Sequence, residues 1–357
     1  MKRMFWLLLL LLLSVSLVLA GDTIGNIRVI TDPQPTHDES RAPLRKLVKV
    51  AEISANLEDE FFLVRPWNVR ADSQGNIYVF DLKVRKFFKY DKNFKLVQVF
   101  GNTGQGPGEY APGNYMVDVE VVKNRSLFFA DGGNRKLIRY DLEGNPVGDI
   151  PFPHNREDYL YPLQGPLESY LCIDRENNRI NAVDSRGEFL YPVLSRRELE
   201  TSLLLEIKPR EYAFAVHLNP LEARCVFLDD HRLAVFLMNS STFYLFDREK
   251  KISEVPIWPK EILSLFKEKV RGKDQNSKLK NAFFHMFNNW FADGDSGPHF
   301  YLEPPGNRDL LQFDFEGNLT ARFSKPCRVI LMAKAGNRFY GVYKDSIIIL
   351  KEERDAN

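Results

Sequence analysis

The sequence predicts an all-β protein built from a repeated unit of short strands, and three observations favour this fold class. Residues 75–101 and 125–150 share one pattern of apolar strands and polar turns, in which Asp81 corresponds to Asp131. An apolar or aromatic residue followed by Asp recurs along the chain, at Tyr90-Asp91, Tyr140-Asp141, Val183-Asp184, Phe246-Asp247 and Phe313-Asp314. The 27 Phe residues suit packing between sheets. A period of this kind is typical of radial or stacked repeat folds.

Each repeat is expected to form one sheet, or blade, of four strands. Strands of the first blade are expected at residues 66–71, 76–80, 86–90 and 95–100. Those of the second are expected at 116–122, 127–130, 136–140 and 146–150. Fainter copies follow at 170–187, 224–247, 300–318 and 329–350. The turns between strands are rich in Gly, Asn, Asp and Ser, which favour tight turns.

The strand count predicts six blades. The sixth copy ends after three strands near residue 351, while one orphan strand is expected at 46–53, where Val48 and Val50 flank Lys49. If this N-terminal strand becomes the outer strand of the last blade, it closes the ring and satisfies an open sheet edge. We therefore predict a six-bladed β-propeller over 46–357, closed by an N-terminal strand. A linear β-solenoid is the alternative, but it leaves the orphan strand unexplained.

The N-terminus predicts export. Lys2 and Arg3 precede a long apolar run that ends in small residues at Ala20, as in a cleaved secretory signal peptide over 1–20. An uncleaved membrane anchor is the alternative. Residues 21–45 carry three prolines among polar residues and predict an extended, poorly ordered linker. We expect a secreted or periplasmic monomer, with no stable membrane insertion after cleavage.

Net charge bears on binding to nucleic acid, and cysteine content bears on disulfide bonding. The formal net charge of +1 becomes −1 when Lys2 and Arg3 are removed, so no global attraction to nucleic acid is expected. Three cysteines are too few for a disulfide framework. Export permits one bridge, but we interpret all three as buried small residues: Cys172, Cys225 and Cys327.

The stretch 100–141 reads FGNTGQGPGEYAPGNYMVDVEVVKNRSLFFADGGNRKLIRYD. It resembles an NHL-type repeat and, more closely, the secreted bacterial six-bladed β-propeller proteins, most of which lack an assigned activity. The GQGPGE loop and the N-I-Y-V-x-D…K-x-x-x-Y-D pattern carry the resemblance, which covers the first two blades firmly and the others in outline. In NHL-like blades the Asp that ends the second strand, here Asp81, Asp131 and Asp174, fixes the following turn.

The connections between blades are long, whereas the turns expected on the opposite face are short. The sequence therefore predicts that the face with the long loops is the binding face. Large planar side chains in or beside the long loops favour recognition of a protein, peptide or glycan. They are Tyr110, Tyr115, Tyr159, Tyr161, Trp258 and Trp290. A helical hairpin expected at 258–288 would cover the centre or bind a partner. The alternative is that these loops only cover the blades.

Inner strands are expected to place polar side chains at the central channel. They are Asn68, Arg70, Asp118, Glu120, Arg224 and Asn289. Asp118 and Glu120 alternate with valines, so both face the same way and could bind a divalent cation such as Ca²⁺. Lactonases of the gluconolactonase type hold such a cation there. The opposing arginines favour an internal charge network, so we predict a non-catalytic binding module without a cofactor. A divalent-metal-dependent lactonase, hydrolase or lyase is the alternative.

Overall fold

The computed structural model describes most of the chain. The described residues are 23–24, 27–29, 35–55, 62–113, 117–122, 125–152, 159–164, 169–174, 179–194, 205–207, 223–227, 232–237, 242–247, 250–261, 264, 289–292, 299–304 and 309–353. Their regular elements are β-strands, together with one 3-10 helix, η1 (Glu39–Arg41). Among these residues, no helix has both the length and the apolar character that crossing a bilayer requires.

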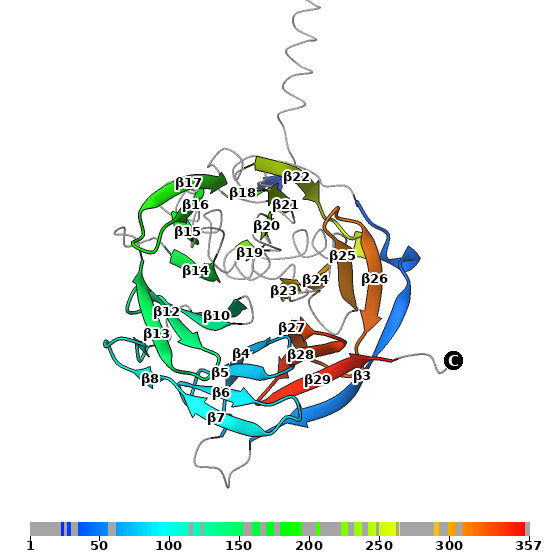
Figure 1. Cartoon of the computed structure of the whole chain (residues 1–357). Helices are drawn as coiled ribbons and strands as arrows, with labels where there is room; N and C mark the ends of the chain where they lie inside the picture. The colour runs from blue at the N-terminus through cyan, green and yellow to red at the C-terminus, as the bar shows by residue number, and fades with distance from the viewer. Residues whose placement is uncertain are drawn as a thin grey trace, which may run out of the picture.

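Six blades stand around a common centre (Figure 1). Blade 1 contains β4 (Pro66–Ala71), β5 (Ile77–Asp81), β6 (Lys86–Tyr90) and β7 (Leu96–Phe100). Blade 2 contains β10 (Val117–Val122), β11 (Ser126–Asp131), β12 (Lys136–Asp141) and β13 (Pro146–Pro151). Blade 3 contains β14 (Tyr159–Gln164), β15 (Tyr170–Asp174), β16 (Arg179–Val183) and β17 (Phe189–Leu194). The first strand of each lies innermost (Figure 1).

The other three blades follow the same antiparallel order. Blade 4 contains β19 (Ala223–Phe227), β20 (Arg232–Leu237), β21 (Thr242–Asp247) and β22 (Lys250–Pro256). Blade 5 contains β23 (Asn289–Ala292), β24 (His299–Glu303), β25 (Leu310–Asp314) and β26 (Leu319–Ser324). Blade 6 contains β27 (Ile330–Ala335), β28 (Arg338–Tyr343) and β29 (Ser346–Glu352). The predicted number of six blades is confirmed.

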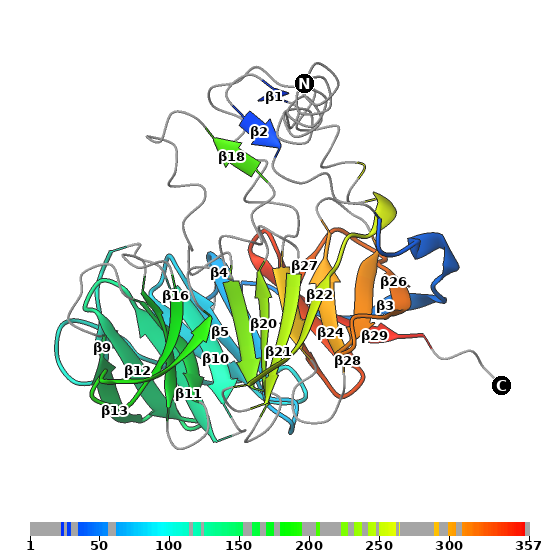
Figure 2. The ribbon, with the colours of Figure 1, turned by 90° about the horizontal axis from the view of Figure 1, so that it is seen from above.

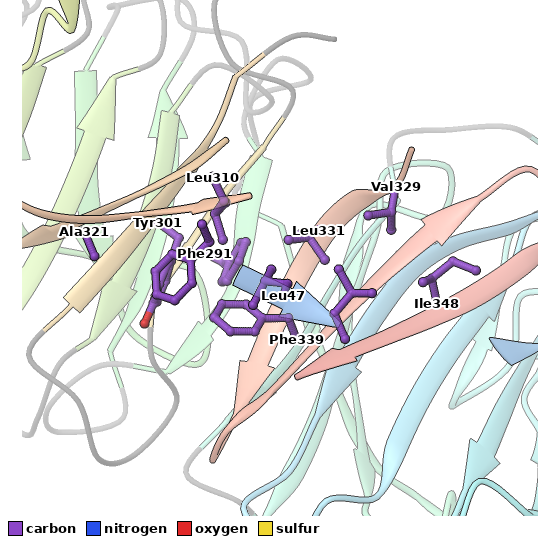
Figure 3. Packing of buried hydrophobic residues seen from close by; sticks show 11 residues of the cluster. Leu47, Phe291, Tyr301, Leu310, Ala321, Val329, Leu331, Phe339 and Ile348 are labelled. Carbon is purple, nitrogen blue, oxygen red and sulfur yellow. The ribbon is translucent and has the colours of Figure 1, made fainter. Parts of the chain in front are cut away.

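The N-terminal strand β3 (Leu44–Ile53) lies between blades 5 and 6. It pairs antiparallel with β29, from Ile53 opposite Ile347 to Leu47 opposite Glu352. Its first residues also pair parallel with β26. Leu47 of β3 is buried among side chains of both blades, including Tyr301 (Figure 3). Blades 5 and 6 therefore form one eight-stranded sheet through β3.

Aromatic packing between neighbouring blades explains the Phe-rich composition. Every residue of β5 is buried, because both faces of a blade are covered by its neighbours. Between blades 1 and 2, the Phe80 ring lies 4.9 Å from the ring centroids of both Phe87 and Phe129. Outer strands lack this double cover, and β22 accordingly alternates exposed and half-buried residues. Cys172 and Cys225 are buried in such inter-blade clusters, as predicted, whereas Cys327 is only half-buried.

The predicted turn role of Asp81 and Asp131 is confirmed. One carboxylate oxygen of Asp81 accepts hydrogen bonds from the backbone N–H groups of Val64 and Arg65, both at 2.7 Å. The other accepts from Lys83 and Val84, in the turn between β5 and β6. One side chain therefore ties the connection that enters the blade to the turn inside it.

Two predicted segments differ from the structure. The helical hairpin at 258–288 is wrong for the residues described there: Trp258 and Pro259 continue as extended chain along Thr36 and His37, and the described elements contain no α-helix. Residues 262–263 and 265–288 lie outside the described residues. Trp258 is held extended by the backbone of the distant residues Thr36 and His37, which apolar spacing alone cannot show.

The segment 21–45 is more than the bare linker predicted. Within it, β2 (Ile27–Val29) pairs with β1 (Thr23–Ile24) and with β18 (Leu205–Ile207), and this small sheet lies off one face of the ring (Figure 2). His37 Nε2 lies 2.7 Å from the carbonyl oxygen of Gly317. The chain thus docks against blades 4 and 5 before β3 begins. Proline content predicted an extended backbone but could not show what the backbone would contact.

Candidate binding site at the centre of the ring

The six inner strands share one pairing register with their second strands. In blade 1, Asn68 of β4 pairs with Phe80, the residue before the last of β5. In blade 2, Asp118 of β10 pairs with Ala130, the residue before the last of β11. The same position in each blade gives one residue per blade: Asn68, Asp118, Tyr159, Arg224, Trp290 and Ile330. We call these backbone positions the inner ring.

Arg70 brings three blades together at the inner strands. Its Nε donates to Glu120 Oε2 at 2.8 Å, and its Nη2 lies 3.7 Å from Asp118 Oδ1. Its Nη1 donates to the carbonyl oxygen of Val69 at 3.0 Å and to that of Met332 in blade 6 at 3.4 Å. The arrangement follows from the alternation of side chains along a strand. Asp118 and Glu120 lie on one face of β10, and Arg70 faces them from β4.

The electrostatics of this cluster fit an ion network. Burial raises the pKa of the Glu120 carboxyl, and the Arg70 guanidinium opposes that shift. Arg70 is 12% exposed and Asp118 is 10% exposed, so both charges lie largely out of water and depend on each other. A cation at Asp118 and Glu120 would have to displace the guanidinium. Within the described part of the chain, no group of three or more His, Cys, Asp or Glu side chains could hold a metal ion.

Of the other predicted channel residues, Asn68 is described with its side chain, whereas Arg224 and Asn289 are described only as backbone. Asn68 is buried on β4, next to Val69. Arg224 holds an inner-ring position, but its side chain lies outside the described residues. Asn289 pairs with Glu303, one residue out of phase with the inner ring, and Trp290 holds the ring position instead. Both residues lie on the inner strand β23, and their side chains are outside the described residues.

Two of the predicted binding-face residues are buried in the fold. Tyr110 is fully buried, and its hydroxyl donates to the backbone carbonyl of Arg85 at 2.7 Å, between blades 1 and 2. Trp258 is 3% exposed. Neither can contact a partner without unfolding its surroundings, so both leave the predicted binding face. Their burial could not be predicted from the sequence, because a planar side chain beside a loop is equally suited to packing and to recognition.

The side chains of the remaining predicted binding-face residues lie outside the described residues. Tyr115 lies outside the described residues. Tyr159 and Tyr161 lie on β14 and Trp290 lies on β23, so their backbone belongs to inner strands rather than to loops. The side chains of these three residues are likewise outside the described set.

Sequence reasoning missed two features of the blades. Trp67 of β4 is 44% exposed, because a bulge between Pro66 and Asn68 leaves it without a partner in the ladder. Glu303 and Lys325 form an ion pair in which both side chains are almost completely buried. A bulge has no single-sequence signature beyond an imperfect alternation, and the partners of the ion pair come from separate strands.

Comparisons with known proteins agree with this architecture. A family model described as a 6-bladed β-propeller matches residues 37–190. The chain is a six-bladed β-propeller. A Bacteroides fragilis protein, provisionally described as exported, superposes with a TM-score of 0.53 at 9% identity, covering 88% of this propeller and 99% of that chain. No curated protein is significantly similar in sequence.

Two further solved structures are similar at lower TM-scores. Virginiamycin B lyase from Staphylococcus aureus has a TM-score of 0.47 at 11% identity, covering 86% of this propeller and 99% of that chain. A provisionally assigned gluconolactonase has a TM-score of 0.47 at 10% identity, covering 86% and 92%. Likeness at this level concerns the fold alone, so the function of the propeller has to be argued from its own residues.

Proposed function

We propose that this propeller is an exported, non-catalytic binding module that engages a protein, peptide or glycan on the face where the long connections enter the inner strands. The observation that carries the proposal is the Arg70 network. Asp118 and Glu120, the carboxylates that could serve a metal, are instead engaged by a guanidinium held between blades. Their chemistry is structural, which leaves recognition rather than turnover to the face around them.

The inner ring supports the same proposal. Its positions carry an amide, a carboxylate, a phenol, a guanidinium, an indole and an aliphatic chain, one from each blade. Varied polar and aromatic groups on a rigid scaffold are what a specific binding site needs. The leader at residues 1–20 supports export, since it has the charge and apolar run of a secretory signal.

The proposal is tested by screening the purified mature chain against peptide and oligosaccharide arrays, with each hit measured by calorimetry. In parallel, lactone hydrolysis is measured with added Ca²⁺ and with chelator. We expect saturable binding of at least one ligand class, and hydrolysis at the background rate in both conditions. Lactone hydrolysis that chelator abolishes, and that Asp118→Asn and Glu120→Gln both remove, would establish the metal-dependent enzyme instead.

A further inference from the structure

Three chain segments meet where blades 6 and 1 adjoin. Ile330, the first residue of β27, pairs with Val342 near the end of β28. Val342 packs in the same cluster as Leu63, which precedes the first strand of blade 1. The beginnings of inner strands and the ends of second strands lie at the same face of a propeller, because the two strands are antiparallel. The segments around residues 64, 330 and 343 therefore lie at one face, beside the centre.

Each of these segments exposes a large apolar side chain. Val64 is 40% exposed, Trp67 is 44% exposed, Ile330 is 41% exposed and Tyr343 is 36% exposed. We call these four residues the rim patch. The inner strands β4 and β27 pack against each other, so the four belong to adjoining structure rather than to scattered sites. A cluster of exposed apolar residues on a soluble protein marks a contact surface more often than isolated residues do.

The bulge at Trp67 supports a role in recognition. Pro66 pairs with Asp81 and Asn68 pairs with Phe80, so Trp67 is an extra residue in the ladder. Such a bulge turns a side chain away from the face that regular alternation would give it. Here the result is an indole exposed next to the centre, whereas the side chain of Val69 on the same strand is fully buried. Burying the indole as well would have required only a regular strand.

Basic residues are interleaved with the rim patch. Arg65 lies between Val64 and Trp67, Arg328 lies two residues before Ile330, and Lys344 follows Tyr343. All three are exposed, and none forms an ion pair with another described residue. Asp345 is an exposed acidic neighbour, so these three basic and one acidic side chains have a positive balance, while the acidic residues 58–60 lie outside the described residues. The whole mature chain is close to neutral, which makes this a local feature rather than a general property.

We propose that the rim patch binds an extended acidic peptide segment of a partner protein, in which apolar and carboxylate side chains alternate. This rests on the proposed binding function and names its surface and partner. Apolar side chains would cover Trp67, Ile330 and Tyr343, while carboxylates would pair with Arg65, Arg328 and Lys344. The aliphatic Val64 and Ile330 favour peptide side chains over sugar rings, which stack on aromatic faces. Trp, Tyr and Arg are the residue types that dominate binding energy at protein interfaces.

The test uses the mature chain and three short synthetic peptides. The first alternates Leu and Asp, the second has Lys in place of Asp, and the third has Ser in place of Leu. Binding is measured by fluorescence anisotropy and calorimetry at low and at high salt. We expect only the Leu-Asp peptide to bind. Trp67→Ala should weaken it about tenfold or more, and Arg65→Gln should weaken it less while reducing its salt dependence. Val97→Ala, which truncates an exposed valine on outer strand β7, is the matched control and should change nothing.

Each other outcome overturns the proposal in a different way. Equal binding of the Lys peptide, or unchanged affinity in Trp67→Ala, shows that the rim patch is not the acidic-peptide site. If an array ligand still binds in that case, the binding function stands and only the rim patch fails. A uronate oligosaccharide that binds through Trp67, or a dimer that Trp67→Ala dissolves in analytical ultracentrifugation, replaces the peptide with a glycan or a second copy. If no ligand binds and lactone hydrolysis depends on a metal, both the binding function and the peptide site at the rim patch are wrong.

Discussion

Glu303 shows how one buried carboxyl can make the stability of the propeller depend on pH. Burial raises its pKa to about 7, although the ammonium of Lys325 opposes the shift. A carboxyl whose pKa is higher in the folded state binds its proton more tightly there. The folded state is therefore favoured at low pH, and this contribution is lost as pH rises from about 4.5 to about 7.

We expect the wild-type chain to lose up to a few kcal/mol of stability over that pH window relative to the double variant Glu303→Gln/Lys325→Met. The double variant removes both charges, because Lys325 alone would remain as a buried, unpaired cation. Denaturant unfolding at pH 5, 6, 7 and 8 measures the difference. Parallel stability curves for the two proteins would show that Glu303 does not titrate in this range.

Asp81 makes a second residue-scale prediction. Its carboxylate accepts four backbone hydrogen bonds that join two segments of blade 1. Asp81→Ala leaves buried donors without an acceptor, so we expect a loss of about 3 kcal/mol in denaturant unfolding. The control is Asp91→Ala, which removes two hydrogen bonds within one exposed turn and should cost about 1 kcal/mol. Equal losses would mean that the link to Val64 and Arg65 contributes nothing.

Individual roles were predictable where a residue acts through its immediate neighbours in sequence. The turn function of Asp81 and Asp131 follows from strand ends and turn chemistry, and Arg70, Asp118 and Glu120 follow from alternation along predicted inner strands. Tyr110 and Trp258 were not predictable, because their surroundings come from other blades. Glu303 and Lys325 were missed for the same reason.

At the scale of elements, the tight turns within blades depend on glycine to different degrees. Gly144, between β12 and β13, has a φ of +79°, and an added Cβ would lie 2.5 Å from the Phe100 ring of blade 1. Gly336, between β27 and β28, has a φ of +57° and no atom within 4 Å of such a Cβ. Packing between blades therefore leaves no room for a side chain at Gly144, whereas a side chain at Gly336 would meet no other atom.

We expect Gly144→Ala to destabilise the chain clearly more than Gly336→Ala. The second substitution should cost about 1 kcal/mol for its left-handed backbone, and the first adds the displacement of a buried ring. Thermal unfolding of both variants measures the comparison. Similar melting temperatures would show that Phe100 moves aside without cost.

Strand positions were predictable from alternation and turn residues, which are local signals. The register was less predictable, because it depends on which residues of two separate strands pair. The bulge at Trp67 and the docking of residues 35–41 on blades 4 and 5 depend on contacts between distant segments. The extended course of Trp258 and Pro259 likewise depends on their contacts with Thr36 and His37.

At the scale of the whole molecule, we propose that β3 is what holds the ring closed. It pairs with β29 along most of its length and joins blade 5 to blade 6. Without it, β26 and β29 would both present open edges, which favour association between chains. The sequence predicted the orphan strand from a strand count, but the parallel contact with β26 was not predicted.

Two truncations test this role. A chain that begins at residue 35 keeps β3, and we expect it to unfold in one cooperative transition as a monomer. A chain that begins at residue 54 lacks β3, and we expect a lower melting temperature with oligomers in size-exclusion chromatography. If both chains melt alike as monomers, β3 is dispensable for closure.

The position of β3 also governs the order in which the molecule can be completed. The strand leaves the ribosome long before its partner β29, because the other five blades are encoded between them. The nascent chain must therefore carry a ten-residue strand with exposed edges while the blades are being made. A product that stops short of residue 346 would keep that edge unmatched, so it should be a species that holdase chaperones or proteases recognise.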